Sequence, residues 1–290
     1  MTRFGFLLVG AAALAAPAFA AEPTPGDLAW RDWGARAMRE VAMPALTRGL
    51  TAEERRAFSV IRFANLPSAE VLPSGARRGE DGRPAVEFSA GYYRALSTQA
   101  EAMALAARAP DRRSALASLK DYPDSHARGL REGAAPDRLR FHVVLGLPAN
   151  VWSPIERDQD FVRARQGLAL DALTFLAARE VAHVMLGQLR PDGKAPVTDR
   201  DSLAKAEARA TSHLLRAEMD PTAALSALGM ARVFEALALG AEYRAAAAIC
   251  RLSAAVTNGV KDAKAEHNLE PSDAAWSEQT TALREAYRCR

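Results

Sequence analysis

The chain has 290 residues, a formal net charge of +3 at pH 7 and a sequence pI near 9.0. Basic and acidic side chains are interspersed, so the mild basicity favours solubility and does not indicate a surface that binds nucleic acid. The length allows one large domain or two small ones with a buried core. Because we find no internal repeat or linker, we expect a single domain.

The first twenty residues have the pattern of a secretory signal peptide. Arg3 precedes an apolar run over residues 4–16, and the small-residue pattern Ala18-Phe19-Ala20 stands before the sequence turns polar. The run is too short to span a bilayer comfortably, and no cysteine at the cleavage site could carry a lipid. We predict a signal peptide over residues 1–20, a mature domain over 21–290, a periplasmic or secreted location and no stable membrane anchor.

Alanine and leucine at helical spacing dominate the first half of the mature chain. A capping box between Thr51 and Glu54 predicts one helix start, and alternating apolar residues predict short strands. A stretch rich in proline, glycine and charge predicts an exposed loop. The predicted elements are helices over residues 27–48, 51–63 and 92–109, strands over 85–89 and 140–146, and a loop over 67–84.

In the second half of the chain, the sequence pattern predicts a series of helices with one long loop. Asp220-Pro221 breaks the helical pattern, because aspartate caps a helix and proline is tolerated in its first turn. Together the two halves predict a fold that is mainly α with a small β-sheet (α+β). The predicted elements here are helices over residues 160–189, 201–218, 221–239, 242–257 and 271–287, and a loop over 190–199.

Cys250 and Cys289 are the two cysteines, and an exported protein can keep a disulfide. A bond between them would stabilise the fold by roughly 4 kcal/mol in the chain-entropy model. In an antiparallel helical hairpin, however, Cys250 would lie about 12 Å from the turn and Cys289 about twice as far, at about 1.5 Å per residue. The sequence leaves the pairing open.

The predicted helix over residues 160–189 is apolar nearly all round its C-terminal half, which is typical of a buried helix. At about 100° per residue, Arg179, Glu180 and His183 fall within an arc of roughly 100°. Buried ionisable groups need ion pairs, hydrogen bonds or a metal. This arc is therefore either a site or a structural ion network in which Glu180 pairs with an arginine.

Residues 175–188, FLAAREVAHVMLGQ, resemble the active helix of gluzincin zinc metallopeptidases of peptidase family forty-eight, the HtpX and CaaX prenyl protease group. That helix reads L-x-A-H-E-x-x-H-V. Its two histidines, one turn apart, bind zinc, and its glutamate activates the zinc-bound water. The resemblance implies a metallopeptidase-like helical core at about residues 140–240.

The following helix extends the resemblance at the spacing of the family. Met219-Asp220-Pro221 matches a Y-D-P or F-D-P element, and counting back from it places Glu207 at the family's aspartate and Leu203 at its glutamate ligand. The likeness covers about residues 164–228, less than a quarter of the chain. Upstream, the family's strand segment is absent.

Compared position by position, most of the zinc ligands implied by the resemblance are lost. His183 matches the second histidine and Glu180 the catalytic glutamate, but Arg179 replaces the first histidine and Gln188 a trailing one. A catalytic zinc needs three protein ligands, and one of the three remains. Arginine stays charged and would repel the metal. We expect the Arg179 guanidinium near the former metal position, paired with Glu180 or Glu207, as an ion-pair link between the two helices.

Three functions remain open from the sequence. The first is an exported pseudopeptidase that binds a peptide or a periplasmic protein without catalysis and without a cofactor, for example by strand addition beside the small sheet. The second is an active zinc peptidase that uses His183, Glu180 or Glu207 and an unidentified ligand, for which His213 is one candidate. The third is a helical scaffold unrelated to peptidases.

Overall fold

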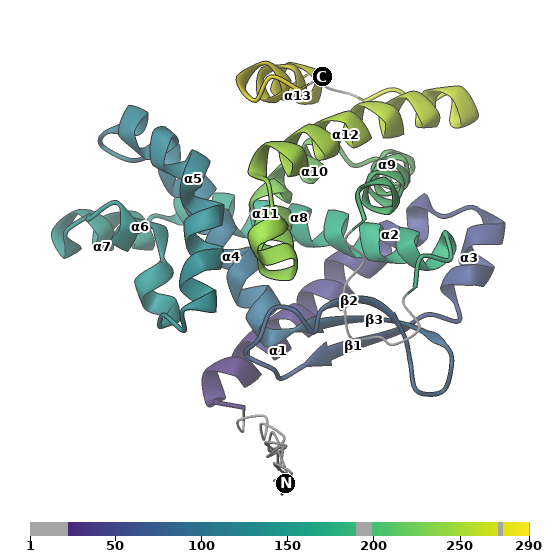
Figure 1. Ribbon diagram of the computed structural model, residues 1–290, viewed down its shortest axis with the longest axis horizontal. Coiled ribbons are helices and arrows are strands. Elements are labelled where there is room, and N and C mark those ends of the chain that lie inside the picture. Colours follow the sequence, from purple (N-terminus) through teal and green to yellow (C-terminus); the bar gives the residue numbers. More distant parts are fainter. Residues whose placement is uncertain (1–22, 190–198, 272–274, 290) are drawn as a thin grey trace, which may run out of the picture.

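The computed structural model describes residues 23–189, 199–271 and 275–289. The predicted signal peptide and nearly all of the predicted 190–199 loop lie outside these residues. The fold is mainly helical with one small sheet, as predicted, and α8 crosses its centre (Figure 1). The α-helices are α1 (Pro25–Ala37), α2 (Met43–Gly49), α3 (Ala52–Phe58), α4 (Ala90–Ala106), α5 (Arg112–Arg131), α6 (Phe141–Val144), α7 (Ala149–Arg157), α8 (Gln159–Met185), α9 (Arg200–Arg216), α10 (Thr222–Ser226), α11 (Leu228–Leu239), α12 (Ala245–His267) and α13 (Ala275–Ala286).

Short helices of other types join some of these elements. The π-helix η1 (Met38–Ala42) continues α1 into α2, so the predicted helix over residues 27–48 is one unbroken helical stretch. The 3₁₀-helices η2 (Pro136–Leu139) and η3 (Gly240–Glu242) stand before α6 and α12. The capping box at Thr51 is formed, with Glu54 N bonded to the threonine hydroxyl and the Glu54 carboxylate bonded to Thr51 N.

The sheet has three strands, β1 (Arg62–Leu66), β2 (Gly75–Arg78) and β3 (Pro84–Ser89), in the order β1-β3-β2. β1 runs parallel and β2 antiparallel to the central strand β3. The carboxylate of Glu87 on β3 accepts two hydrogen bonds from Arg77 on β2, at 2.6 and 2.7 Å. This pair ties the edge strand to the centre of the sheet.

Several predicted elements were wrong. The expected strand over residues 140–146 is the short helix α6, and the expected 67–84 loop contains β2. Phe141 is buried while Val143 and Val144 are exposed, and the pattern that suggested a strand has no neighbouring strand to pair with in the described sheet. The predicted helix over residues 51–63 ends at Phe58, because the chain turns there into β1.

The main hydrophobic core lies between the sheet, α4, α8 and α11. Val86 and Phe88 of β3 pack with the rings of Tyr92 and Phe234 and with Phe175 of α8. A second cluster, around Phe141, joins α4, α5, α6, α7 and the start of α8. Both faces of α8 are therefore covered over its C-terminal half, as its apolar sequence predicts.

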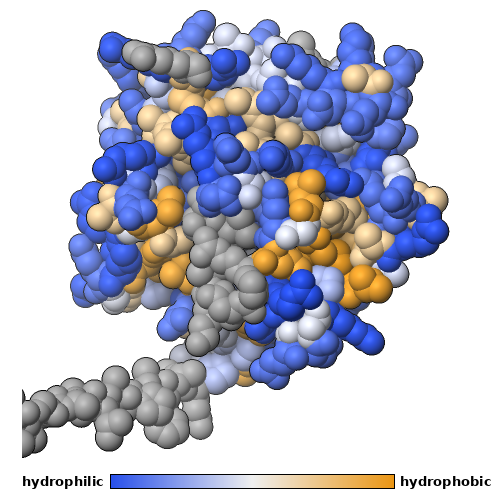
Figure 2. All heavy atoms as spheres, turned by 45° about the vertical axis from the view of Figure 1, so that its right-hand side comes forward, coloured by the Kyte–Doolittle hydropathy of each residue, from blue (hydrophilic) through white to orange (hydrophobic). Residues whose placement is uncertain are grey.

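The surface carries charged and polar side chains over most of the face in Figure 2, with apolar patches on either side of the grey segment. Val60, the most exposed of the large apolar side chains, is 55% accessible, and the others are scattered over several elements. None of the described helices combines the length and the apolar run that a membrane span requires.

Cys250 of α12 and Cys289, beyond the end of α13, form a disulfide with a Cα–Cα distance of 5.3 Å. The sequence predicted different distances of the two cysteines from the turn of the hairpin, because the first helix was expected to end near residue 257. Because α12 continues to His267, Cys250 lies roughly 25 Å from its end, and Cys289 lies roughly 21 Å from the start of α13. The two sulfurs therefore reach similar heights in the hairpin.

Candidate functional site: the Arg-Glu-x-x-His arc of α8

The site lies in the C-terminal half of α8, where the helix contacts α4, α9, α10 and β2. Arg179, Glu180 and His183 are exposed by only 2%, 6% and 1%. The predicted polar arc is thus in the interior of the protein. Each of its three ionisable side chains must find partners there.

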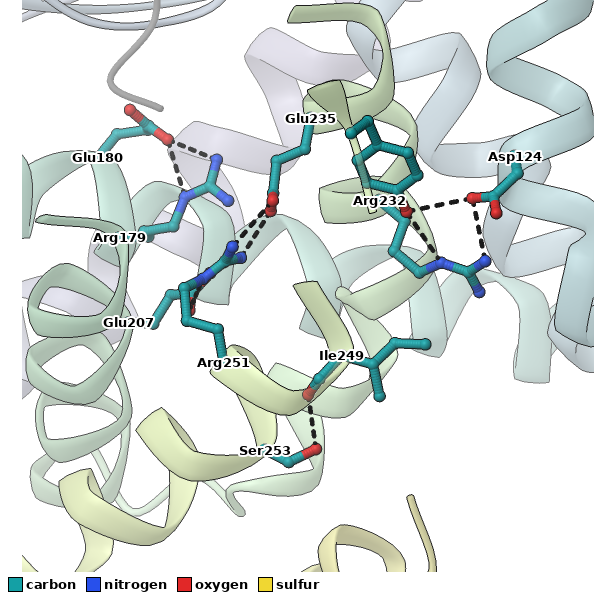
Figure 3. Close-up of polar contacts among 10 residues, drawn as sticks. Asp124, Arg179, Glu180, Glu207, Arg232, Glu235, Ile249, Arg251 and Ser253 are labelled. Carbon is teal, nitrogen blue, oxygen red and sulfur yellow. Dashed lines mark hydrogen bonds and ion pairs between the residues drawn. The ribbon is translucent and has the colours of Figure 1, made fainter. Parts of the chain in front are cut away.

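Arg179 pairs with its neighbour Glu180. Its Nε and Nη2 both donate to Glu180 Oε1, at 3.0 and 2.7 Å (Figure 3). Its guanidinium carbon lies 6.0 Å from the centre of the Phe234 ring. Burial would lower the pKa of Arg179, but the charges of Glu180 and Glu207 and the hydrogen bond to Glu180 raise it above its usual value. Position 179 therefore holds a fixed positive charge.

Glu180 also links α8 to the sheet. Its second oxygen, Oε2, accepts a hydrogen bond of 2.9 Å from Ala76 N on β2. Burial alone would raise the pKa of Glu180, but the charge of Arg179 and the hydrogen bonds from Arg179 and Ala76 hold the pKa below its usual value. These hydrogen bonds are structural, and they clamp helix to strand.

Gly75 allows β2 to approach the carboxylate. Its φ of +126° lies in the region that favours glycine, and a Cβ there would lie 3.3 Å from Glu180 Oε2. A larger residue at position 75 would strain the backbone just where Ala76 N reaches the helix. The clamp thus depends on this glycine as well as on Glu180.

His183 is held by Gln188, the residue at the family's trailing histidine. His183 Nδ1 lies 2.8 Å from Gln188 Oε1, and Gln188 N donates to the carbonyl oxygen of His183 at 2.9 Å. Burial is the largest influence on His183 and lowers its pKa, so the imidazole is neutral at pH 7. Because an amide oxygen only accepts, the tautomer that forms the contact with Gln188 Oε1 carries its proton on Nδ1.

Glu207 pairs with Arg251 of α12, a residue that the sequence did not single out. Arg251 donates to both oxygens of Glu207, at 3.0 and 2.9 Å, and to both oxygens of Glu235 on α11, at 2.8 and 2.6 Å (Figure 3). The expectation that Arg179 itself joins the two helices was therefore wrong: Arg179 pairs within α8, and Arg251 links α9 to α11 and α12.

Leu203 is 3% exposed on α9 and adds an aliphatic side chain where the family has a ligand. His213, the other ligand candidate, places its Nε2 at 2.9 Å from Glu54 Oε1. Within the described residues, no group of three or more His, Cys, Asp or Glu side chains is arranged to hold a metal ion. Arg179, Leu203 and His183, the three residues that the sequence resemblance aligns with zinc ligands, do not fit zinc, because they offer a guanidinium, an isobutyl group and one imidazole.

The buried arginines and glutamates around α8 form an ion network in which the carboxylates accept hydrogen bonds. A hydrolytic centre would instead leave a carboxylate free to activate water. Two arginines, Arg179 and Arg251, lie among the three buried carboxylates of Glu180, Glu207 and Glu235. Arg179 Nη1 and the Tyr92 hydroxyl are buried with no hydrogen-bond partner in the described part of the chain. A water-activating glutamate needs an accessible oxygen, and both oxygens of Glu180 already accept hydrogen bonds.

Comparisons with known proteins gave no match: no family model, no curated protein and no solved structure resembles this chain.

Proposed function

We propose that the protein is an exported pseudopeptidase, a metallopeptidase-like protein that binds a peptide or protein partner without cutting it. The observation that carries the proposal is the Arg179–Glu180–Ala76 clamp. The residue at the first histidine position neutralises the residue at the catalytic glutamate position, and the backbone of β2 bonds its other oxygen. The groups that a peptidase uses for chemistry thus serve here to join a helix to a sheet.

The proposal includes export, for which two features give support. The apolar run after Arg3 has the signal-peptide pattern. The disulfide between Cys250 and Cys289 is a bond that persists in oxidising compartments. Both features fit a periplasmic or secreted protein.

Strand addition at β2, the mode by which the family binds its substrates, is disfavoured in this proposal. An added strand would need the outward N–H of Ala76, and Glu180 already accepts its hydrogen bond. β2 is also short and carries Arg77 and Arg78, features that protect sheet edges from pairing. Partner binding is therefore expected on another surface.

Rebuilding the zinc site tests whether α8 and α9 have metallopeptidase-like geometry. The variant R179H/L203E combines a histidine and a glutamate with the native His183, which completes the family's ligand set. We expect it to hold about one zinc per chain and to unfold at a higher temperature with zinc than without, because a ligand that binds only the folded state stabilises it. R179H/L203Q is the matched control, which lacks the carboxylate and should bind zinc far more weakly.

The rebuilt variant is best purified in zinc, since the carboxylate that L203E introduces would otherwise be buried and unpaired. If the variant folds by circular dichroism and holds no more zinc than R179H/L203Q, the two helices do not share the family's geometry. The resemblance would then be accidental, and the unrelated helical scaffold would replace the pseudopeptidase.

A further inference from the structure

A charged groove between α9 and α12 has no role in the clamp. Its volume is about 660 Å³, and Glu54 of α3 and Leu186, just after α8, also line it. This volume lies in the range of ligand-binding pockets, roughly 300–1,000 Å³. Hereafter "the groove" means this cavity, with one wall from α9 and the other from α12.

The α9 wall is basic. Lys205, Arg209 and Arg216 lie along one face of the helix, with Ser212 between the arginines. In the described part of the chain, the side chain of Lys205 has no ion-pair or hydrogen-bond partner. The side chain of Arg209 makes such a contact only through Nη2. Donors on this wall are therefore available to an anionic group.

Glu54 holds the arginines of this wall in place. Its Oε1 accepts hydrogen bonds from Arg209 Nη2 at 3.0 Å and from Arg216 Nη2 at 3.1 Å, and it also contacts His213. Arg216 Nη1 forms an ion pair with Oε2 at 2.9 Å. Burial would raise the pKa of Glu54, but the hydrogen bonds with His213, Arg216 and Thr51 N hold the pKa well below its usual range. One carboxylate between two guanidinium groups leaves a net positive charge, and Lys205 adds another.

The α12 wall is polar and acidic. Asn258, Asp262 and Glu266 follow each other at four-residue spacing, and all three are exposed. Asp262 has no partner in residues 23–189, 199–271 and 275–289, and Glu266 contacts only His267 there, at 3.7 Å. Among the same residues, no ion pair joins these carboxylates to Lys205 or Arg209 across the groove.

The floor of the groove keeps the two walls at a fixed separation. A Cβ on Gly259 of α12 would lie 2.3 Å from the carbonyl oxygen of Ala208 on α9, so the helices are in backbone contact there. The two helices therefore cannot approach each other more closely at this point. The opposite charges of the walls remain available to an occupant.

We propose that the groove binds a peptide segment that carries acidic and basic side chains close together. The acidic groups face Lys205 and Arg209, and the basic groups face Asp262 and Glu266. From Lys205 to Arg216 the wall extends about 16 Å at roughly 1.5 Å per residue, which matches about five residues of extended peptide at roughly 3.3 Å each. A free amino acid would span only part of it.

The test is selection of a random-peptide library, displayed on phage, on the immobilised mature protein. Enriched peptides are then synthesised, and their affinities are measured by fluorescence anisotropy. K205E/R209E and D262K/E266K each reverse one wall. R112E/R113E makes the same charge change as K205E/R209E at two exposed positions at the start of α5. Circular dichroism reports whether each variant is folded, and the two wall variants test the groove independently.

We expect enriched peptides that contain both charge signs, and roughly tenfold weaker binding to either wall variant with little change for R112E/R113E. Absence of enrichment, enriched peptides of one charge sign only, or wild-type affinity for either wall variant would each overturn the proposal. The groove does not depend on the metallopeptidase likeness, so failure of the rebuilt zinc site would leave it standing.

Discussion

Replacement of Glu180 by glutamine should destabilise the protein. The carboxylate accepts hydrogen bonds from Arg179 on one oxygen and from Ala76 N on the other. A glutamine amide has one acceptor and one donor group, so it cannot satisfy both sides in either orientation. Breaking a buried ion pair costs about 3–5 kcal/mol, and an unpaired buried donor about 1–3 kcal/mol.

Because glutamine keeps one hydrogen-bond acceptor, we expect the free energy of unfolding to fall by about 3–4 kcal/mol, near the lower end of the cost of a broken pair. At roughly 2–4 °C per kcal/mol for a chain of this size, the melting temperature should fall by roughly 6–16 °C. Urea denaturation followed by tryptophan fluorescence measures the first quantity, and calorimetry the second. E53Q, at an exposed glutamate on α3, is the matched control.

The effect of E180Q should also depend on pH. The folded pKa of Glu180 is lowered, so its contribution to stability is present above the unfolded pKa of about 4.3 and is lost as the pH falls through the folded value. The difference between wild type and E180Q should therefore shrink below about pH 4. An E180Q protein as stable as E53Q at pH 7 would refute the clamp. Replacement of a catalytic glutamate is expected to leave the protein as stable as wild type or to make it more stable.

Three further predictions concern other parts of the fold. R251M should lower the free energy of unfolding by about 3–5 kcal/mol by leaving Glu207 and Glu235 buried without a counter-ion, and R251M/E207L/E235L should recover most of that loss in the same urea assay. C289S should lower stability by up to about 4 kcal/mol and increase amide exchange in α13, while unchanged exchange would mean that packing alone holds the helix. His126 is buried against Gln99, and burial, aided by the charge of Arg94, lowers its pKa from 6.5 to about 4. Stability should therefore fall by roughly 3 kcal/mol as the pH drops from about 6.5 to about 4, and an NMR midpoint for His126 above 6 would contradict this.

The long helices could be predicted from the sequence because their patterns are local. α8 is apolar around its C-terminal half, and the Asp220-Pro221 break stands where α9 has ended and α10 begins. β2 could not be predicted in the same way. Its residues Gly75–Arg78 read as a polar loop, and they form a strand because their backbone pairs with β3. Glu87 of β3 also binds Arg77, and Glu180 of α8 binds Ala76 N.

The candidate site was only partly predictable for the same reason. Burial of Arg179, Glu180 and His183 follows from the apolar residues around them, and the Arg179–Glu180 pair was one of the two pairings that we expected. Arg251 lies 44 residues from Glu207, so their pairing depends on how α9 and α12 pack. A single arginine in the alanine-rich start of α12 was the one available signal, since a buried charge there needs a partner.

Zinc content tests the central claim most directly. The mature wild-type protein is purified without chelator, incubated with zinc at neutral pH, dialysed and analysed by mass spectrometry for metal per chain. We predict far less than one zinc per chain in wild type and no further loss in H183A, because the pseudopeptidase proposal assigns Arg179 and Leu203 to two of the three ligand positions. About one zinc per wild-type chain, lost in H183A, would contradict the pseudopeptidase proposal. It would show that the protein has a zinc site that includes His183 and further ligands.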